Sequence, residues 1–485
     1  MATTIVLYPA PGIGHVVSMV ELGKLILHHH HHHFAVVILV ATGPFDTSAT
    51  TSYINHISQT YPSITFHHFP SLPFQLSLKP SPTRSYVAIL CHFIRLNNHN
   101  LLQALQSISE TTTIRSLIVD FFCPTAIQIA ADHGIPTYCF FTSGAAFLAA
   151  LLYFRAIHNQ TIESFKEMKM KPSSHLHFPG LPSIPLSSMP EVMRNPDDEA
   201  YHDGLYISDN LPNLKGIVVN TFASLEPKVI RAIEDGLCVP DGPTPPVYYI
   251  GPVIANPKDR IGDGEAMYSR SDCLSWLDNQ PSRSVVFLCF GSRGSFSLTQ
   301  LEEIAVGLEK SGHRFLWVVR NPLFGDNIKQ ILEPVDPDLE LLLPDGFLDR
   351  TKKKGLVVTS WAPQIEVLNH ESVGGFVTHC GWNSVLESVC AGVPMVAWPL
   401  YAEQHMNKEV LVEDMKLAMP MEASSEDGFV SSAEVEKRVR SLMESEEGRV
   451  LRERGKDFSR KALAVWAEDG SSFTTFTELV ESWKL

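Results

Sequence analysis

The stretch that decides the fold runs from position 361 to 404, WAPQIEVLNHESVGGFVTHCGWNSVLESVCAGVPMVAWPLYAEQ. Its apolar spacing predicts a strand over 375–378, a tight turn at 379–381, a helix over 382–391 and another strand over 393–398. A strand that runs through a glycine turn into a helix directs backbone N–H groups and the positive helix end at one point. The stretch therefore predicts an α/β domain with an anion site at the turn.

Side chains around this turn suit a nucleotide sugar. Trp361 and Trp382 offer flat faces for stacking, and the first turn of the helix carries hydrogen-bond donors at Asn383 and Ser384. Acceptors for hydroxyl groups follow at three positions: Glu387, Glu403 and Gln404. Each residue alone is equally compatible with ordinary α/β packing, but together they predict a nucleotide-sugar pocket.

The whole segment resembles, almost position for position, the signature segment of plant family-1 UDP-sugar-dependent glycosyltransferases. The likeness extends along nearly the whole chain and is greatest to the branch that acts on chalcones, flavonoids and related phenols. It implies the GT-B arrangement, in which two Rossmann-like α/β domains with parallel sheets face each other across a cleft.

The resemblance also implies which residues bind each part of the UDP-sugar donor. Uracil would stack on Trp361, next to Ala362, and the ribose would bond to Gln364 and Glu387. The diphosphate would be held by His379, Asn383, Ser384 and by Ser292 of the loop Gly291-Ser292-Arg293-Gly294. The sugar would be read by Trp382, Glu403, Gln404 and, from the first half of the chain, Thr142.

Length and composition limit the number of domains and the kinds of partner that the protein can have. At 485 residues the chain exceeds one ordinary core, so two domains are expected. The net charge of −15 disfavours nucleic acid and anionic membranes as partners. Eight scattered cysteines, and a start that enters a strand without a basic leader, predict a cytoplasmic protein. We also expect a monomer. The uncharged run 134–154 splits into strand, turn and helix, so no membrane span is expected.

Pro-, Gly- and Asp-rich segments at 240–246 and 256–265 predict a domain boundary. The expected order is an acceptor-binding domain, a linker, a UDP-sugar-binding domain and, from the resemblance, a C-terminal helix that packs back on the first domain: 1–245, 246–270, 271–465 and 466–485.

The first half of the chain presents a candidate base. A strand over 5–8 and a turn lead into a helix over 16–27, with His15 where the helix begins. The turn contains Gly12-x-Gly14, but a dinucleotide fingerprint would need a third glycine at Val17. Ligands of open α/β sheets bind at the carboxyl ends of strands. The helix N-terminus would oppose protonation of the ring and so keep it neutral, as a base must be.

Asp120 ends an apolar strand over 116–119 and needs a partner if it is buried. It can pair with His15, as carboxylates do in hydrolase triads, or cap the following helix. Spacing does not decide between the two, but the resemblance identifies His15 and Asp120 with the catalytic pair of the family.

Further candidates are less specific. Thr142 follows a strand and can also cap a helix. A long helix is expected over 86–105. Walls for a flat aromatic acceptor are expected from four apolar side chains that alone would suit a core: Ile94, Phe121, Phe122 and Phe147.

Two signals compete with this interpretation. Asp336-Pro337-Asp338 is a D-x-D, by which other glycosyltransferases hold a metal, but it lies in an acidic loop rather than after an apolar strand. We interpret it as surface and expect neither a metal nor a cofactor. The run His28–His33 is expected to be a loop without function.

The sequence thus predicts an inverting glucosyltransferase that converts UDP-glucose and a phenol into a β-O-glucoside. By resemblance, galactose users tend to carry His at the position of Gln404, and glucuronate users carry Arg at that of Trp382. Two alternatives stay open: C-glucosylation of the same acceptors, and a non-catalytic protein that binds nucleotide sugars.

Overall fold

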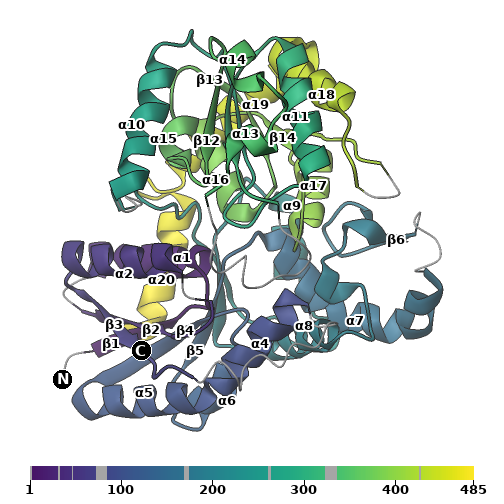
Figure 1. Ribbon diagram of the computed structural model, residues 1–485. Coiled ribbons are helices and arrows are strands. Elements are labelled where there is room, and N and C mark those ends of the chain that lie inside the picture. Colours follow the sequence, from purple (N-terminus) through teal and green to yellow (C-terminus); the bar gives the residue numbers. More distant parts are fainter. Residues whose placement is uncertain are drawn as a thin grey trace. The chain divides into compact units, whose positions relative to one another are not determined.

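The structure, a computed structural model, describes residues 3–30, 33–45, 47–72, 85–168, 174–259, 264–322, 336–424 and 428–484 (Figure 1). The chain divides into two compact units, one formed by Met1–Ala255 with Ala464–Leu485 and the other by Asn256–Leu463. Each unit is built on one large sheet whose neighbouring strands are all parallel. None of the described helices is both long and apolar enough for a membrane crossing.

The first unit has a seven-stranded sheet in the order β3-β2-β1-β4-β5-β8-β9. These strands span Ile64–His68, Ala35–Val40, Thr3–Tyr8, Thr113–Asp120, Thr137–Phe141, Gly216–Val219 and Val247–Tyr249. The central strands are almost wholly buried and therefore apolar along their length, as strands covered on both faces must be.

Helices cover both faces of this sheet. Figure 1 shows α1 (Ile13–His30) and α2 (Ser48–Thr60) on one face and α5 (Asn98–Thr111) and α6 (Thr125–Ala131) on the other. The remaining helices are α4 (Tyr86–Leu96), α7 (Ala145–Met168), α8 (Glu199–Asn210), α9 (Pro227–Glu234) and α20 (Ser471–Lys484). A two-stranded antiparallel ribbon, β6 (His175–Leu176) with β7 (Ile184–Pro185), lies in the Pro- and Ser-rich segment.

The second unit has a six-stranded sheet in the order β12-β11-β10-β13-β14-β15. The strands span Gly355–Thr359, Arg314–Val319, Val285–Cys289, Val373–Thr378, Met395–Ala397 and Ala418–Pro420. Its helices are α10 (Gly264–Asp278), α11 (Leu298–Ser311), α13 (Leu339–Leu342), α14 (Phe347–Thr351), α15 (Gln364–Leu368), α16 (Trp382–Ala391), α17 (Gln404–Glu413), α18 (Ser432–Glu444) and α19 (Glu446–Ala464).

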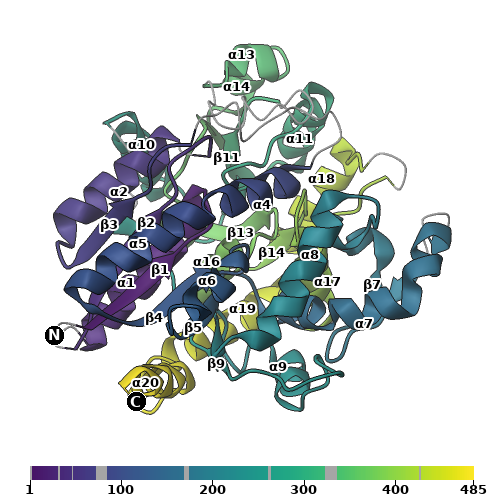
Figure 2. The ribbon, with the colours of Figure 1, turned by 90° about the horizontal axis from the view of Figure 1, so that it is seen from below.

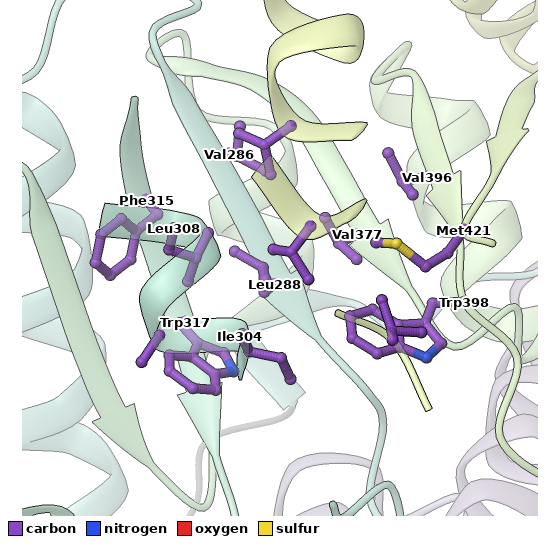
Figure 3. Close-up of a cluster of buried hydrophobic side chains, with 14 of the residues drawn as sticks. Val286, Leu288, Ile304, Leu308, Phe315, Trp317, Val377, Val396, Trp398 and Met421 are labelled. Atoms are coloured by element: carbon purple, nitrogen blue, oxygen red, sulfur yellow. The ribbon is translucent and has the colours of Figure 1, made fainter. Parts of the chain in front are cut away.

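The core of the second unit lies between this sheet and helices α11 and α18. Figure 3 shows Ile304 and Leu308 of α11 among Leu288, Phe315 and Trp317 of the strands. Burial of side chains of this size stabilises a fold by about 1.5–3 kcal/mol each. This packing supports the strands whose carboxyl ends carry the donor segment.

The C-terminal helix α20 packs on the first unit, where it contacts β4 and β9 (Figure 2). The Tyr138 hydroxyl lies 3.1 Å from that of Ser482, and the Arg115 side chain donates to the Trp483 carbonyl. Just before this helix, the Trp466 indole donates to the Pro252 carbonyl over 3.2 Å. The last segment of the chain is therefore part of the first unit.

The structure corrects the prediction of a loop for the first three histidines of the run, because α1 includes His28 to His30. Positions 31 and 32 lie outside the described residues. Histidine does not break a helix, and the His29 ring packs against aromatic rings of the C-terminal segment, 6.3 Å from Trp466 and 5.7 Å from Phe473 between centroids.

The expected helix over 86–105 is also wrong, since it is broken at Asn97 into α4 and α5. The Asn97 amide is fully buried and donates to the Phe93 carbonyl over 3.0 Å. Its oxygen accepts from Asn100 over 2.9 Å. Asparagine side chains compete with the helical backbone in this way and so favour helix ends. Similarly, Val247–Tyr249 of the expected linker forms strand β9 of the first sheet.

Candidate active site

The candidate base lies where the strand order of the first sheet reverses. Chain connections run in opposite directions from β1 and β4, and such a switch point opens a crevice at the carboxyl ends of the two strands. The turn after β1 leads into α1 with His15 as its third residue, and Asp120 is the last residue of β4. The topology therefore brings together two residues that are 105 positions apart.

His15 and Asp120 are in hydrogen-bond contact, with 2.7 Å between Nδ1 and Oδ2. Asp120 is fully buried, and its other oxygen accepts from the backbone N–H of Phe122 over 3.1 Å. A carboxylate partner assigns the proton to Nδ1, which leaves the Nε2 lone pair of a neutral ring to take a proton. The alternative role as a cap of α6 is wrong, because the cap position of that helix is Pro124.

Aromatic rings lie beside the histidine. The Phe122 ring is 5.7 Å from the His15 ring between centroids, and the Phe121 ring is 6.3 Å from it. Phe147, the third residue of α7, packs edge-on against Phe121 at 6.1 Å. These three of the four expected acceptor walls are thus grouped at the His–Asp pair. Ile94 is 1% exposed within α4.

Thr142 lies in the turn between β5 and α7, one strand further along the sheet from Asp120. The helix that it was expected to open begins at Ala145. Its first two backbone amides donate to the carboxylate of Glu226, over 2.9 Å from Ala145 and 2.8 Å from Ala146. Glu226 therefore caps this helix, and Thr142 is half-buried in the turn before it.

The candidate donor site lies at the switch point of the second sheet, between β10 and β13. The loop 291–294 follows β10, and the turn 379–381 joins β13 to α16. A Cβ atom at either Gly291 or Gly381 would lie 2.5 Å from Nε2 of His379. The imidazole therefore fills the space between the two turns, and only glycine fits at both positions.

His379 is 6% exposed, and its Nδ1 has no hydrogen-bond partner among the described residues. Burial lowers the pKa of this histidine to about 4, so the ring is neutral near pH 7. A neutral imidazole still carries one N–H and can donate it to a ligand. The buried Nδ1, which has no hydrogen-bond partner among the described residues and lies beside a helix N-terminus, fits a bound anion. The predicted diphosphate contact requires such a site.

We expect this histidine to make the second unit less stable in acid. Its pKa falls from 6.5 to about 4 on folding, so the unfolded chain binds an extra proton between these values, and stability falls as pH drops through them. The difference corresponds to roughly 3 kcal/mol, at 1.36 kcal/mol for each pH unit. Denaturant unfolding at pH 7 and 4.5 should show a smaller acid loss for His379→Gln than for the wild type.

The matched control for this prediction is His99→Gln, which changes an exposed histidine of the first unit. Its acid loss should equal that of the wild type. An equal acid loss for His379→Gln and the wild type would contradict the prediction.

The predicted ribose residues form a polar cluster on α15 and α16. Gln364 donates from Nε2 to Oε2 of Glu387 over 2.6 Å and to the Ser384 hydroxyl over 2.8 Å. Glu387 is 3% exposed. The structure therefore places Ser384 with Gln364 and Glu387, although it was expected at the diphosphate.

The other predicted donor residues surround these turns. Gln404 is 3% exposed, and its Oε1 accepts from the backbone N–H groups of Leu400 and Tyr401, each over 3.0 Å. Its oxygen thus holds its own loop. Trp382 is 3% exposed and Ala362 is 5% exposed, so both lie almost wholly in the interior of the site. Ser292 is exposed, and three residues are half-buried: Trp361, Asn383 and Glu403.

Several supporting contacts were not predicted. Asn407 of α17 donates to the Cys380 carbonyl over 3.0 Å, which holds the turn in which Cys380 has a positive φ of 65°. Arg320, which directly follows β11, donates to the Gly291 carbonyl over 3.1 Å. The Arg293 guanidinium lies 4.9 Å from the centre of the Tyr401 ring. The sequence could have indicated Arg320, because it is a single charged residue directly after an apolar strand. It gave no sign of the partner of Asn407.

The D-x-D residues have structural roles. Asp336 accepts from the Ser360 hydroxyl over 2.8 Å, and Asp338 caps α13 by accepting from the Glu340 N–H over 3.1 Å. Both carboxylates are exposed, in agreement with the surface interpretation. In the part of the chain that the structure describes, no three His, Cys, Asp or Glu side chains are grouped to hold a metal ion. All eight cysteines are free thiols.

Known proteins resemble the chain over its whole length. The family described as "UDP-glucoronosyl and UDP-glucosyl transferase" matches residues 247–447. The chain is 54% identical to UDP-glycosyltransferase 88F4 of Malus domestica over 99% of its length and 100% of that protein. It is 52% identical, over the same shares, to a phloretin 2'-O-glucosyltransferase of Malus domestica.

A solved structure supports the same family assignment. Phytolacca americana UGT2, complexed with UDP-2fluoro-glucose and pterostilbene, matches all of both chains at a TM-score of 0.87 and 36% identity. The predicted GT-B class, with two Rossmann-like units on parallel sheets, is confirmed. The chain belongs to the UDP-glycosyltransferase family and is a glycosyltransferase with a UDP-sugar as its co-substrate.

Proposed function

We propose that the enzyme transfers glucose from UDP-glucose to a phenolic hydroxyl and releases UDP, with a β-O-glucoside as the product. The observation that carries this proposal is the 2.7 Å contact between His15 and the buried carboxylate of Asp120. It supplies a general base of defined tautomer at the ligand-binding edge of the first sheet.

In the proposed reaction, Nε2 of His15 takes the phenol proton as the phenol oxygen attacks the anomeric carbon. The bond from that carbon to the diphosphate oxygen breaks, and UDP leaves with the electron pair. Asp120 stabilises the imidazolium that forms. Because a phenol has a pKa of about 10, partial proton transfer suffices, and a positioned base contributes roughly 10²–10⁴-fold. Attack opposite the leaving group inverts the carbon and converts an α-linked donor into a β-glucoside.

The second unit would bind the donor. We assign Trp361 and Ala362 to uracil and the cluster of Gln364, Ser384 and Glu387 to the ribose. His379, Asn383 and Ser292 would hold the diphosphate at the two turns. Trp382, Glu403, the Gln404 amide and Thr142 would bind the glucose. An imidazole donor and a helix N-terminus would serve the diphosphate without a metal.

The first unit would bind the acceptor. Phe121, Phe122 and Phe147 offer apolar contact for an aromatic ring beside His15, and we keep Ile94 of α4 as a fourth wall of the acceptor site. One protein similar to this chain is named for the phenol phloretin, and another was solved in complex with the phenol pterostilbene. The first is named for O-transfer, which supports an O-glucoside. We further propose that the enzyme acts as a monomer in the cytoplasm, where its free thiols would stay reduced.

The test is incubation of the purified protein with UDP-glucose and a panel of phenols that includes phloretin. We expect a product heavier by one hexose, with a large anomeric coupling for a β-linkage and release of glucose in hot acid. An acid-stable product would establish the C-glucoside alternative, since a C-glucoside survives hydrolysis. Binding of UDP-glucose without turnover of any phenol would favour the non-catalytic alternative, and faster use of UDP-glucuronate would contradict the donor assignment.

A further inference from the structure

A buried carboxylate distant in the sequence holds the helix that supports the aromatic wall. Glu226 is 4% exposed and sits at the cap position of α9. Its Oε2 accepts from the N–H of Ala145 over 2.9 Å, and its Oε1 accepts from the N–H of Ala146 over 2.8 Å. These amides are the first two of α7, where the positive end of the helix favours a carboxylate.

Phe147 follows these two amides in the chain, and the ring of Phe121 lies between it and the candidate base. Phe147 packs against Phe141 at 5.7 Å and against Phe121 at 6.1 Å between centroids. Phe121 follows Asp120 directly in the chain, and its ring lies 6.3 Å from that of His15. The first turn of α7 therefore supports the aromatic wall beside the imidazole.

The loop that carries Glu226 is itself fixed at several points. The side chain of Asn220 accepts from the Val253 N–H over 2.7 Å and donates to the Val253 carbonyl over 2.9 Å. The Gly251 N–H donates to the Thr221 carbonyl over 2.6 Å, and the Ser472 hydroxyl donates to the Gly251 carbonyl over the same distance. The carboxylate thus extends from a backbone that is tied to the segment after β9 and, through that segment, to the C-terminal segment.

We infer that Glu226 is a positioning residue for the acceptor: it fixes the start of α7 and so holds Phe147 and Phe121 in place beside His15. This inference rests on the proposed function, in which these rings bind the phenol. Glu226 touches neither substrate in this account. Its effect on the reaction passes through the aromatic wall, so it should change how the phenol is held and leave the binding of UDP-glucose unchanged.

The test compares Glu226→Gln with Glu226→Asp. Glutamine keeps the shape but turns an N–H₂ group toward a backbone N–H, and aspartate keeps the charge but is too short to reach both amides. For each variant kcat/KM for phloretin should fall about tenfold, as expected when a hydrogen bond to a buried charge is lost. The KM for UDP-glucose should stay within about twofold of the wild type, because that contact is independent. The control is Glu234→Gln, which alters an exposed carboxylate at the other end of α9 and should change neither constant.

A double-mutant cycle with Phe147→Leu separates this inference from the proposed function. If Glu226 acts through this ring, the double variant should lose about as much as the worse single variant. Phe147→Leu with wild-type phloretin kinetics would refute the acceptor wall. An effect of Phe147→Leu together with folded, fully active Glu226 variants would refute the positioning role. Failure of both Glu226 variants to fold, judged by circular dichroism and melting, would also overturn it, because the carboxylate would then be a requirement of folding.

Discussion

His15→Ala is expected to lower kcat for phenol glucosylation by roughly 10²- to 10⁴-fold, the range that a positioned general base contributes. The substitution removes the imidazole whose Nδ1 is bound by Asp120 at 2.7 Å, so no group remains to take the phenol proton. The KM for UDP-glucose should stay near the wild-type value, because the proposed donor residues lie in the second unit apart from Thr142. Initial rates at saturating phloretin and varied UDP-glucose measure both constants.

The matched control for His15→Ala is His99→Ala, which changes an exposed histidine of the same unit and should leave turnover unchanged. Calorimetric binding of UDP to both variants tests whether the second unit is intact. Full turnover by folded His15→Ala would remove the imidazole from the mechanism. A rise in the KM for UDP-glucose at unchanged kcat would instead place His15 in donor binding.

Asp120→Asn should cost nearly as much, roughly 10²- to 10⁴-fold in kcat. The carboxylate accepts two hydrogen bonds, one from His15 and one from the Phe122 N–H. An asparagine has one acceptor oxygen, so its N–H₂ group must face one of these donors. Either the imidazole adopts the wrong tautomer, or the turn after β4 loses its hydrogen bond. Steady-state rates at saturating substrates measure the loss in kcat, and melting curves show whether the variant is as stable as the wild type.

The control for Asp120→Asn is Asp132→Asn, an exposed change one helix further along the chain, which should keep the wild-type rate. The double variant His15→Ala/Asp120→Asn should be no slower than His15→Ala alone, because residues that act as a unit are strongly non-additive. Additive losses would contradict the pairing and would indicate that the two residues act at separate steps.

The donor segment was largely predictable from sequence because its signals are local. An apolar strand, a turn that ends in glycine and a helix stopped by Gly392, which has a φ of 70°, each follow from nearby residues. The role of Asp120 could not be decided from nearby residues, because a carboxylate after a strand can either cap a helix or pair with His15. The sheet order, which sequence spacing does not specify, brings the two residues together.

Other features depend on contacts that no local pattern encodes. The α7 cap comes from Glu226, about 80 positions away, and the sequence offered only Thr142 as a possible capping residue. The histidine run is helical up to His30, where rings from the C-terminal segment pack against His29. Ser384 bonds to Gln364 because helices α15 and α16 pack side by side. The position of Ser384 in the first turn of α16 did not indicate this contact.

The account stands on the general-base role of His15, and a series of phenols of decreasing pKa tests it most directly. We would measure kcat/KM for the wild type and His15→Ala with acceptors of similar shape whose pKa falls from about 10, the value of an ordinary phenol, to below 7. Acidic phenols are already ionised at pH 7.5 and need no base. The ratio of wild-type to variant rates should therefore fall steeply along the series, toward unity for the most acidic acceptors. A ratio that stays constant across the series would contradict general-base catalysis by His15.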